Sequence, residues 1–89
     1  MKGKSFIVKT SGIIEPVEPA NGNDFSLEEL KKAIGGGYIE VVFIPPDRMM
    51  VIDEEGKLKG MPVNVVASRM YAADSIVGDV LVCHKNQIK

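Results

Sequence analysis

The sequence of 89 residues contains no tryptophan, one cysteine and one histidine. A lone cysteine cannot form an internal disulfide, and one cysteine with one histidine leaves too few soft ligands for a structural zinc site. Long apolar stretches are also missing: the run at residues 6–8 is too short for a signal-peptide core or a membrane span. We therefore expect a protein of a reducing, cytoplasmic compartment, with no membrane contact and no cofactor.

A basic surface is missing too. The 11 lysines and arginines stand against 12 aspartates and glutamates, give a formal net charge of −1, and are spread along the whole chain. Proteins that bind nucleic acid usually carry a clustered basic stripe that displaces counterions from phosphate. Tyr38 and Phe43 do not have the aromatic spacing of an RNA-recognition sheet. Nucleic acid is therefore not an expected partner.

The composition that remains is that of one small globular domain. Hydrophobic residues make up 45% of the chain and charged residues 26%, which are ordinary proportions for a folded protein. A chain of this size has a thin stability margin, to which a homodimer interface would add. We expect a single domain over residues 1–89. Residues 1–24 form a strand and a connector rich in proline, asparagine and glycine, residues 25–84 form the main body, and residues 85–89 form a frayed tail.

One helix is predicted by its start and stop signals. Ser26 and Glu29 fit a capping box, in which each side chain accepts a hydrogen bond from the backbone N–H of the other residue. The glycines at 35–37 end the helix, because glycine accepts the left-handed conformation of a C-cap. Between these signals lies an apolar stripe at helical spacing, formed by Leu27, Leu30, Ala33 and Ile34.

The other elements are strands and a second, short helix. Residues 38–44 are apolar on both faces apart from Glu40, which is typical of a central strand. Residues 48–53 return antiparallel to it, and further strands are expected at 5–10 and 80–84. Pro16 limits a short strand at 13–15 to an edge, and Asn64 is the expected N-cap of the second helix. The stretch 54–62 either turns or adds a strand.

This order of elements, β-α-β-β-α-β, predicts an α+β fold with a mainly antiparallel sheet and two helices. The arrangement is either ferredoxin-like or a related curled sheet. In both cases we expect the two helices to pack on one face of the sheet.

No catalytic constellation is visible. Cys83 and His84 are neighbours in a predicted strand, so their side chains point to opposite faces and cannot act as a pair. The acidic residues at 53–55 lack the ligand spacing of a calcium loop, and we interpret them as a solvated hairpin turn in which Gly56 takes a positive φ. The glycines at 35–37 follow a helix, the reverse of a phosphate-binding loop. We therefore do not expect an enzyme.

Glu40 is the one anomalous charge. A carboxylate within an apolar strand costs desolvation energy unless it is exposed or paired. It either faces solvent, as a gatekeeper against edge aggregation, or lines a binding groove with Tyr38 on the same face. In the second case Arg48 or Arg69 would be its natural partner.

Three segments carry a family resemblance: Gly-Gly-Tyr-Ile-Glu-Val-Val at 36–42, the acidic turn leading to Met-Pro-Val-Asn at 53–64, and Ile-Val-Gly-Asp-Val-Leu-Val at 76–82. They resemble the domain-of-unknown-function family DUF3846, small domains of phages, conjugative elements and their bacterial hosts. The resemblance covers roughly residues 25–84, and Met61 stands where leucine is usual. It implies no reaction, cofactor or catalytic residue. The residues within its motifs are the candidate binding site: Tyr38, Glu40, Asn64 and Asp79.

These observations favour a non-catalytic binding module that engages a host or mobile-element protein. A surface rich in methionine would suit such a partner, although methionine more often fills core gaps; the residues concerned are Met49, Met50, Met61 and Met70. The alternative is a protein that sequesters a small ligand or nucleotide at the face of Tyr38 and Glu40. A small enzyme is the least supported of the three.

Overall fold

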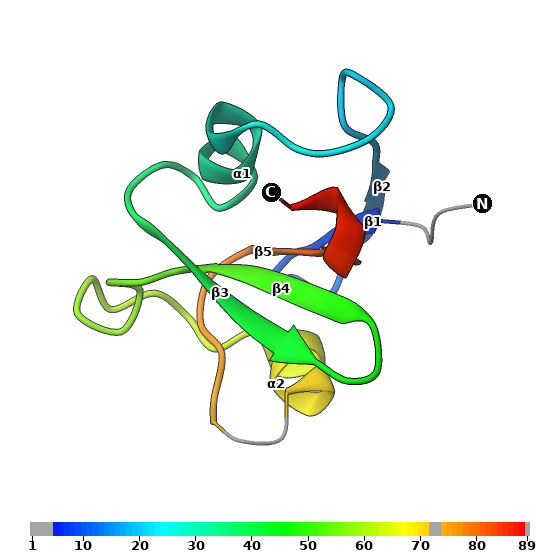
Figure 1. Cartoon of the computed structure of the whole chain (residues 1–89). Helices are drawn as coiled ribbons and strands as arrows, with labels where there is room; N and C mark the ends of the chain where they lie inside the picture. Colours follow the sequence, from blue (N-terminus) through cyan, green and yellow to red (C-terminus); the bar gives the residue numbers. More distant parts are fainter. Residues whose placement is uncertain (1–4, 72–73, 89) are drawn as a thin grey trace.

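The computed structural model describes residues 5–71 and 74–88, and Figure 1 shows the arrangement of the elements. Within these ranges, no helix has the length and apolar character needed to cross a bilayer. The elements in chain order are β1 (Ser5–Val8), β2 (Ile14–Val17), α1 (Leu27–Ala33), β3 (Ile39–Ile44), β4 (Arg48–Asp53), α2 (Val65–Met70), β5 (Val80–His84) and a 3-10 turn (Lys85–Gln87).

The five strands form one antiparallel sheet in the order β2-β1-β5-β4-β3. This confirms the predicted α+β fold with two helices and an antiparallel sheet. A split β-α-β unit needs parallel strands joined by a helical crossover. Here α2 joins β4 to β5, which are antiparallel neighbours with no strand between them, and β5 lies between β1 and β4. The chain therefore adopts the related curled sheet and not the ferredoxin-like arrangement. Residues 54–60 turn, so no extra strand forms there.

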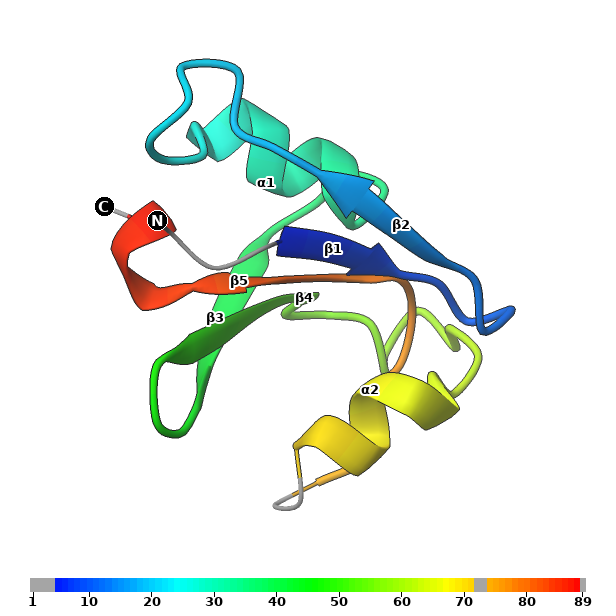
Figure 2. The ribbon, with the colours of Figure 1, turned by 90° about the vertical axis from the view of Figure 1, so that its right-hand side faces the viewer.

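The helices lie on opposite faces of the sheet, and the expectation that both pack on one face is wrong. Figure 2 shows α1 on one side of the strands and α2 on the other. Side chains alternate between the two faces along each strand. Because β4 and β5 carry apolar residues at successive positions, they contribute to a core cluster on each face. The α2 side includes Met50, Ala67 and Val82; the α1 side includes Leu30 and Leu81.

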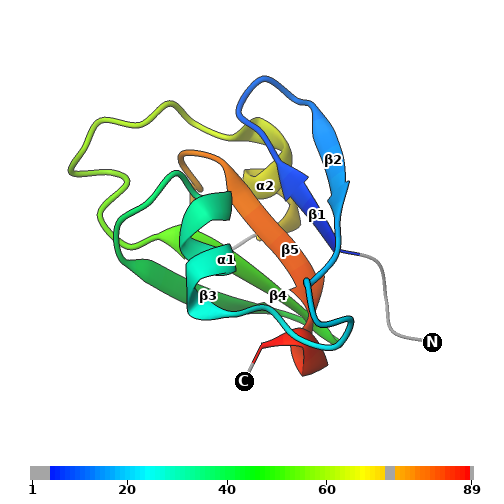
Figure 3. The same ribbon diagram turned by 90° about the horizontal axis from the view of Figure 1, so that it is seen from above.

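The central strand is β5, not the segment around residues 39–44. All but the last residue of β5 are buried, whereas β3 is an edge strand whose positions are half-buried or exposed. Figure 3 shows β2 and β3 at the two margins of the sheet. The prediction failed because an apolar pattern on both faces indicates cover by a helix on each side, and does not say how many strand neighbours a strand has. The other edge is β2, as expected from Pro16, but the strand runs from Ile14 to Val17 and includes this proline, whereas it was expected at 13–15.

The capping box of α1 is confirmed. The Glu29 N–H donates to Ser26 Oγ at 3.1 Å, and the Ser26 N–H donates to Glu29 Oε1 at 2.8 Å. Hydrogen bonds from the N–H groups of Ser26 and Ala20 lower the pKa of the Glu29 carboxyl. Of the predicted apolar stripe, Leu30 and Ile34 are buried, while Leu27 is 55% exposed.

Residues 85–88 are ordered, which corrects the expected frayed tail. The 3-10 turn Lys85–Gln87 is closed by a hydrogen bond from the His84 N–H to Gln87 Oε1 at 2.8 Å. The Gln87 carbonyl accepts a hydrogen bond from the Phe25 N–H at 2.8 Å, and Ile88 packs against the α1-side cluster. Lys89 lies outside the described residues. The tail thus covers the beginning of the segment that leads into α1.

Candidate functional site

The hydrogen-bond pattern of β4 determines what β3 presents at its free side. The Glu54 N–H donates to the Tyr38 carbonyl at 3.0 Å, and the Lys85 N–H donates to the Asp47 carbonyl at 2.9 Å. In an antiparallel ladder, hydrogen-bonded pairs recur at every second residue. Therefore β4 bonds to β3 through its even-numbered residues and to β5 through its odd-numbered residues.

It follows that β3 also bonds to β4 through its even-numbered residues. The odd-numbered residues direct their backbone N–H and C=O groups away from β4, along the open edge of the sheet; they are Ile39, Val41 and Phe43. Two large side chains beside this edge are exposed: Tyr38 by 66% and Phe43 by 48%. An edge of this kind is a template for another extended chain.

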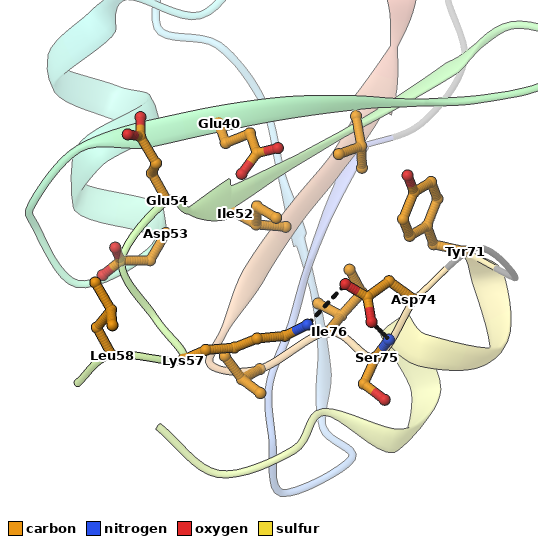
Figure 4. Close-up of a pocket in the computed structure, with 12 residues that line it drawn as sticks. Glu40, Ile52, Asp53, Glu54, Lys57, Leu58, Tyr71, Asp74, Ser75 and Ile76 are labelled. Carbon is orange, nitrogen blue, oxygen red and sulfur yellow. Dashed lines mark hydrogen bonds and ion pairs between the residues drawn. The ribbon is translucent and has the colours of Figure 1, made fainter. Parts of the chain in front are cut away.

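A pocket of about 190 Å³ lies beside the edge, on the α2 face of the sheet (Figure 4). Its floor and walls come from three segments that are far apart in the sequence. Strands β3 and β4 contribute Glu40, Val42 and Ile52; the turn after β4 contributes Glu54, Lys57 and Leu58; the segment before β5 contributes Asp74, Ser75, Ile76 and Val77, with Tyr71 at the end of α2.

The charge of the pocket is mainly negative. Lys57 Nζ donates to Asp74 Oδ2 at 2.7 Å, which ties the turn after β4 to the segment before β5 (Figure 4). The hydrogen bond from Lys57 has the largest effect on the pKa of the Asp74 carboxyl and lowers it. A hydrogen bond from the Ser75 N–H lowers this pKa further. Over residues 5–71 and 74–88, by contrast, the carboxylates of Glu40 and Glu54 make no ion pair within 4 Å. The pocket therefore keeps two uncompensated negative charges at the β3 margin.

The sequence suggested that the acidic turn after β4 is solvated. In the structure, Asp53 anchors this turn. The Asp53 side chain is 1% exposed and accepts hydrogen bonds from Lys59 Nζ and the Glu55 N–H, both at 2.8 Å. Gly56 does not take a positive φ. It is glycine because an added Cβ would lie 2.9 Å from Val77 Cγ2, so this turn packs tightly against the segment before β5.

The loss of folding stability at acid pH should depend on the Asp53–Lys59 pair. Burial alone would raise the pKa of the Asp53 carboxyl, but the Lys59 and Glu55 hydrogen bonds and the Lys59 charge outweigh burial and lower it. A carboxyl with a lowered folded-state pKa stabilises the fold above its unfolded-state value, and this contribution is lost as pH falls through the folded-state value. Urea unfolding between about pH 6 and pH 3 should therefore show a smaller loss of stability for Asp53→Asn than for the wild type.

The matched control for that measurement is Glu18→Gln, which removes an exposed carboxylate that makes no hydrogen bond in the described structure. Its acid dependence should follow the wild type. An acid dependence of Asp53→Asn equal to that of the wild type would show that this pair does not contribute.

Asn64 is a structural residue, which corrects its nomination as a binding residue. It is fully buried, and its Oδ1 accepts a hydrogen bond from the Ala67 N–H at 3.0 Å, as expected of the N-cap of α2. Its Nδ2 donates to the carbonyls of Val8 and Gly78, each at 2.9 Å. One side chain thus joins α2, the end of β1 and the segment before β5, and leaves no atom for a ligand.

The other nominated residues are also separated. Asp79 Oδ1 accepts a hydrogen bond from the Thr10 N–H at 3.0 Å, so it holds the turn between β1 and β2. Glu40 lines the pocket, whereas Tyr38 stands beside it at the entrance to β3. Arg48 lies opposite Ile44 at the far end of the β3–β4 hairpin, and Arg69 does not line the pocket. Neither arginine forms the expected ion pair with Glu40. The structure therefore keeps Tyr38 and Glu40 at one edge and places Asn64 and Asp79 elsewhere.

The methionines do not form one surface. Met50 is fully buried, Met49 packs against the α1-side cluster, and Met61 is half-buried; Met70 is 40% exposed. Gap filling is the better description of Met49, Met50 and Met61, whereas Met70 is exposed by itself.

The remaining chemical groups lie away from the pocket. Burial raises the pKa of the Cys83 thiol to about 11, so the thiol is protonated at neutral pH. His84 Nε2 lies 3.5 Å from Asp47 Oδ2, and His84 Nδ1 accepts a hydrogen bond from the Asn86 N–H at 3.1 Å. Residues 5–71 and 74–88 contain no cluster of three or more His, Cys, Asp or Glu side chains that could hold a metal ion.

Fold and site together define a small α+β protein with a five-stranded antiparallel sheet, a helix on each face, and an acidic pocket beside an open strand edge. The chain belongs to the family described as domain of unknown function (DUF3846), which it matches over residues 5–88. The match extends further toward both ends than the motifs at 36–82, and it includes β1, β2 and the 3-10 turn. No curated protein and no solved structure matches the chain.

Proposed function

We propose that this protein is a non-catalytic binding module that engages a protein partner by strand addition at β3. The observation that carries the proposal is the open edge, where Ile39, Val41 and Phe43 direct their backbone N–H and C=O groups away from the sheet. In strand addition these main-chain groups supply affinity, and pockets for alternate side chains supply specificity. The β3 edge has both, because the pocket at Glu40 lies directly beside it.

The other edge of the sheet is less suited to this role. Strand β2 has four residues and contains Pro16, which has no N–H to donate. Natural proteins protect edges with short strands and prolines, and β2 has both devices. Strand β3 has six residues and no proline, with Glu40 as its one charged side chain. An edge that is left available in this way is consistent with use by a partner.

The setting proposed for this interaction is the cytoplasm of a bacterium, with a partner that belongs to the host or to a mobile element. The setting comes from the family resemblance, and the single, buried, unpaired Cys83 accords with a reducing compartment.

A pair of substitutions at Phe43 separates the main-chain contribution from that of the ring. Phe43→Pro removes an outward N–H and spares the bonds to β4, so the fold should tolerate it as an edge strand does. Phe43→Thr removes the same aromatic ring but keeps the N–H. Partner protein captured from a bacterial lysate by wild type should fall at least about 10-fold with Phe43→Pro and much less with Phe43→Thr.

Thermal unfolding of both variants provides the control, since each must remain folded at the temperature of capture. Equal retention of the same partner by folded Phe43→Pro and Phe43→Thr would contradict strand addition at this edge.

A second candidate, sequestration of a small ligand, is favoured only by the pocket itself. Its volume of about 190 Å³ lies below the range of roughly 300–1,000 Å³ that is usual for ligand sites. Its carboxylates also oppose the phosphates of a nucleotide. A thermal-shift screen against nucleotides and small amines distinguishes the candidates, because a bound ligand raises the melting temperature by mass action, and a flat response would remove this second function.

A further inference from the structure

Three residues are neighbours at the end of the β3–β4 pair, on the side of the sheet that faces the pocket: two lie on the β3 side, and one lies directly after β4. Tyr38 is opposite Glu54 across the β3–β4 pair, and Glu40 is two residues further along β3. Side chains at alternate positions of a strand, and at directly opposite positions of its neighbour, share one face of the sheet. We call this group, Tyr38, Glu40 and Glu54, the acidic rim.

Among the residues that the structure describes, the charges of the acidic rim have no partner. Lys59 pairs with Asp53 at 2.8 Å, and Lys57 pairs with Asp74 at 2.7 Å, so both lysines of this turn are engaged by other carboxylates. No arginine or lysine among the described residues pairs with Glu40 or Glu54. Nearby cations that could have neutralised the rim are thus held elsewhere.

We propose that the added strand carries a lysine or arginine whose side chain lies across this rim, between Glu40 and Glu54 and against the ring of Tyr38. The proposal rests on the proposed function, since it identifies the chemistry of the partner at the same edge. An extended segment with a basic residue complements both the free main-chain groups of β3 and the two carboxylates beside them.

The register of strand addition favours this contact. Glu40 is hydrogen-bonded toward β4, so an incoming antiparallel strand meets it at a non-hydrogen-bonded position, where side chains of opposing residues come closest. Opposing Cβ atoms are then about 4.5–5.5 Å apart, within easy reach of a charged pair. The Tyr38 ring, 66% exposed, can accept the flank of a guanidinium or ammonium group.

A second copy of the chain fits this edge less well. Antiparallel self-pairing centred on Val41 would place Glu40 opposite Val42 of the other copy. The two Glu40 residues would then be diagonal neighbours, roughly 7–8 Å apart, a distance at which two like charges repel each other. Charge complementarity therefore selects a basic segment over a homodimer.

The test is panning of a phage-displayed library of random dodecapeptides on the full chain at low salt. Enriched peptides should share a lysine or arginine at one fixed position within an alternating apolar pattern. Their affinity, measured by fluorescence anisotropy of a synthetic peptide, should fall about 3- to 5-fold for Glu40→Gln or Glu54→Gln, and on the order of 10-fold for both together. The matched charge control, Glu18→Gln on the loop after β2, should leave the affinity unchanged.

The outcomes distinguish this inference from the function on which it rests. No enriched peptide, or binding that Phe43→Pro does not weaken, would overturn strand addition itself. Enriched peptides that need the N–H of Phe43 but lack a common basic residue, or that bind the Glu40→Gln and Glu54→Gln variants as well as the wild type, would overturn only the basic segment. A stable dimer in sedimentation, dissociated by Phe43→Pro, would assign the edge to a second copy.

Discussion

Asn64→Ala is expected to lower the free energy of unfolding by about 3–7 kcal/mol, through loss of a helix N-cap and of the donor to two buried carbonyls. The N-cap hydrogen bond to Ala67 accounts for about 1 kcal/mol. The carbonyls of Val8 and Gly78 lose their Nδ2 donor, at about 1–3 kcal/mol each. Small domains have about 5–15 kcal/mol in total, so the variant should be near the limit of folding.

Urea unfolding followed by far-ultraviolet circular dichroism measures this loss, since the chain has no tryptophan. Asn86→Ala is the matched control, because Asn86 is exposed and its side chain makes no hydrogen bond in the described structure; its effect should stay within about 0.5 kcal/mol. Asn64→Asp keeps the acceptor for Ala67 but sets an oxygen against two carbonyl oxygens, so it should destabilise at neutral pH as well. Near-wild-type stability of both Asn64 variants would contradict the bridging role.

Local signals in the sequence predicted local structure well. The capping box at Ser26, the glycines after α1 and the N-cap at Asn64 each depend on a few neighbouring residues, and all three appear as expected. The proline in β2 likewise indicated an edge strand. Such features follow from backbone hydrogen bonding within one turn or one strand, which residue type and spacing largely determine.

The arrangement of elements was less accessible because it depends on pairing between distant segments. Nothing local in residues 39–44 tells whether one strand or two lie beside them, so β3 was expected at the centre of the sheet. The helices were expected on one face because the order of elements favoured such an arrangement, although strands that are apolar on both faces indicate cover on each side. Asn64 illustrates the same limit: its N-cap role was visible, but its bonds to Val8 and Gly78 span 56 and 14 residues.

Only part of the candidate site could be predicted from the sequence, for the same reason. Glu40 stood out as a charge within an apolar strand, and the structure places it beside a pocket at an open edge. Lys57 and Asp74, which close the pocket, are 17 residues apart and carry no sequence pattern that links them. The sequence feature related to this side of the pocket is Gly56. It is glycine because the turn after β4 packs closely there against Val77 in the segment before β5.

Leu81→Ala should have the second large effect and tests whether β5 is the centre of the sheet. Leu81 is fully buried in the middle of β5, where strands flank it on both sides, and its side chain packs in the α1-side cluster. Truncation of a buried leucine removes apolar contact and leaves a cavity, at a cost of about 2–5 kcal/mol. We expect a loss within this range in urea unfolding, with an unchanged dependence on urea concentration.

Leu27→Ala is the matched comparison, because it removes the same atoms from a leucine that the sequence assigned to a buried stripe. Leu27 is 55% exposed at the first position of α1, so little apolar surface returns to water and alanine favours the helix. Its effect should remain within about 0.5 kcal/mol. Comparable losses for the two variants would mean that Leu27 is buried in the core. A small loss for Leu81→Ala would mean that the centre of the core lies away from β5. A large difference between them is expected if β5 is the centre of the core and is covered by Leu30 of α1 and by Ile34 at the C-cap of this helix.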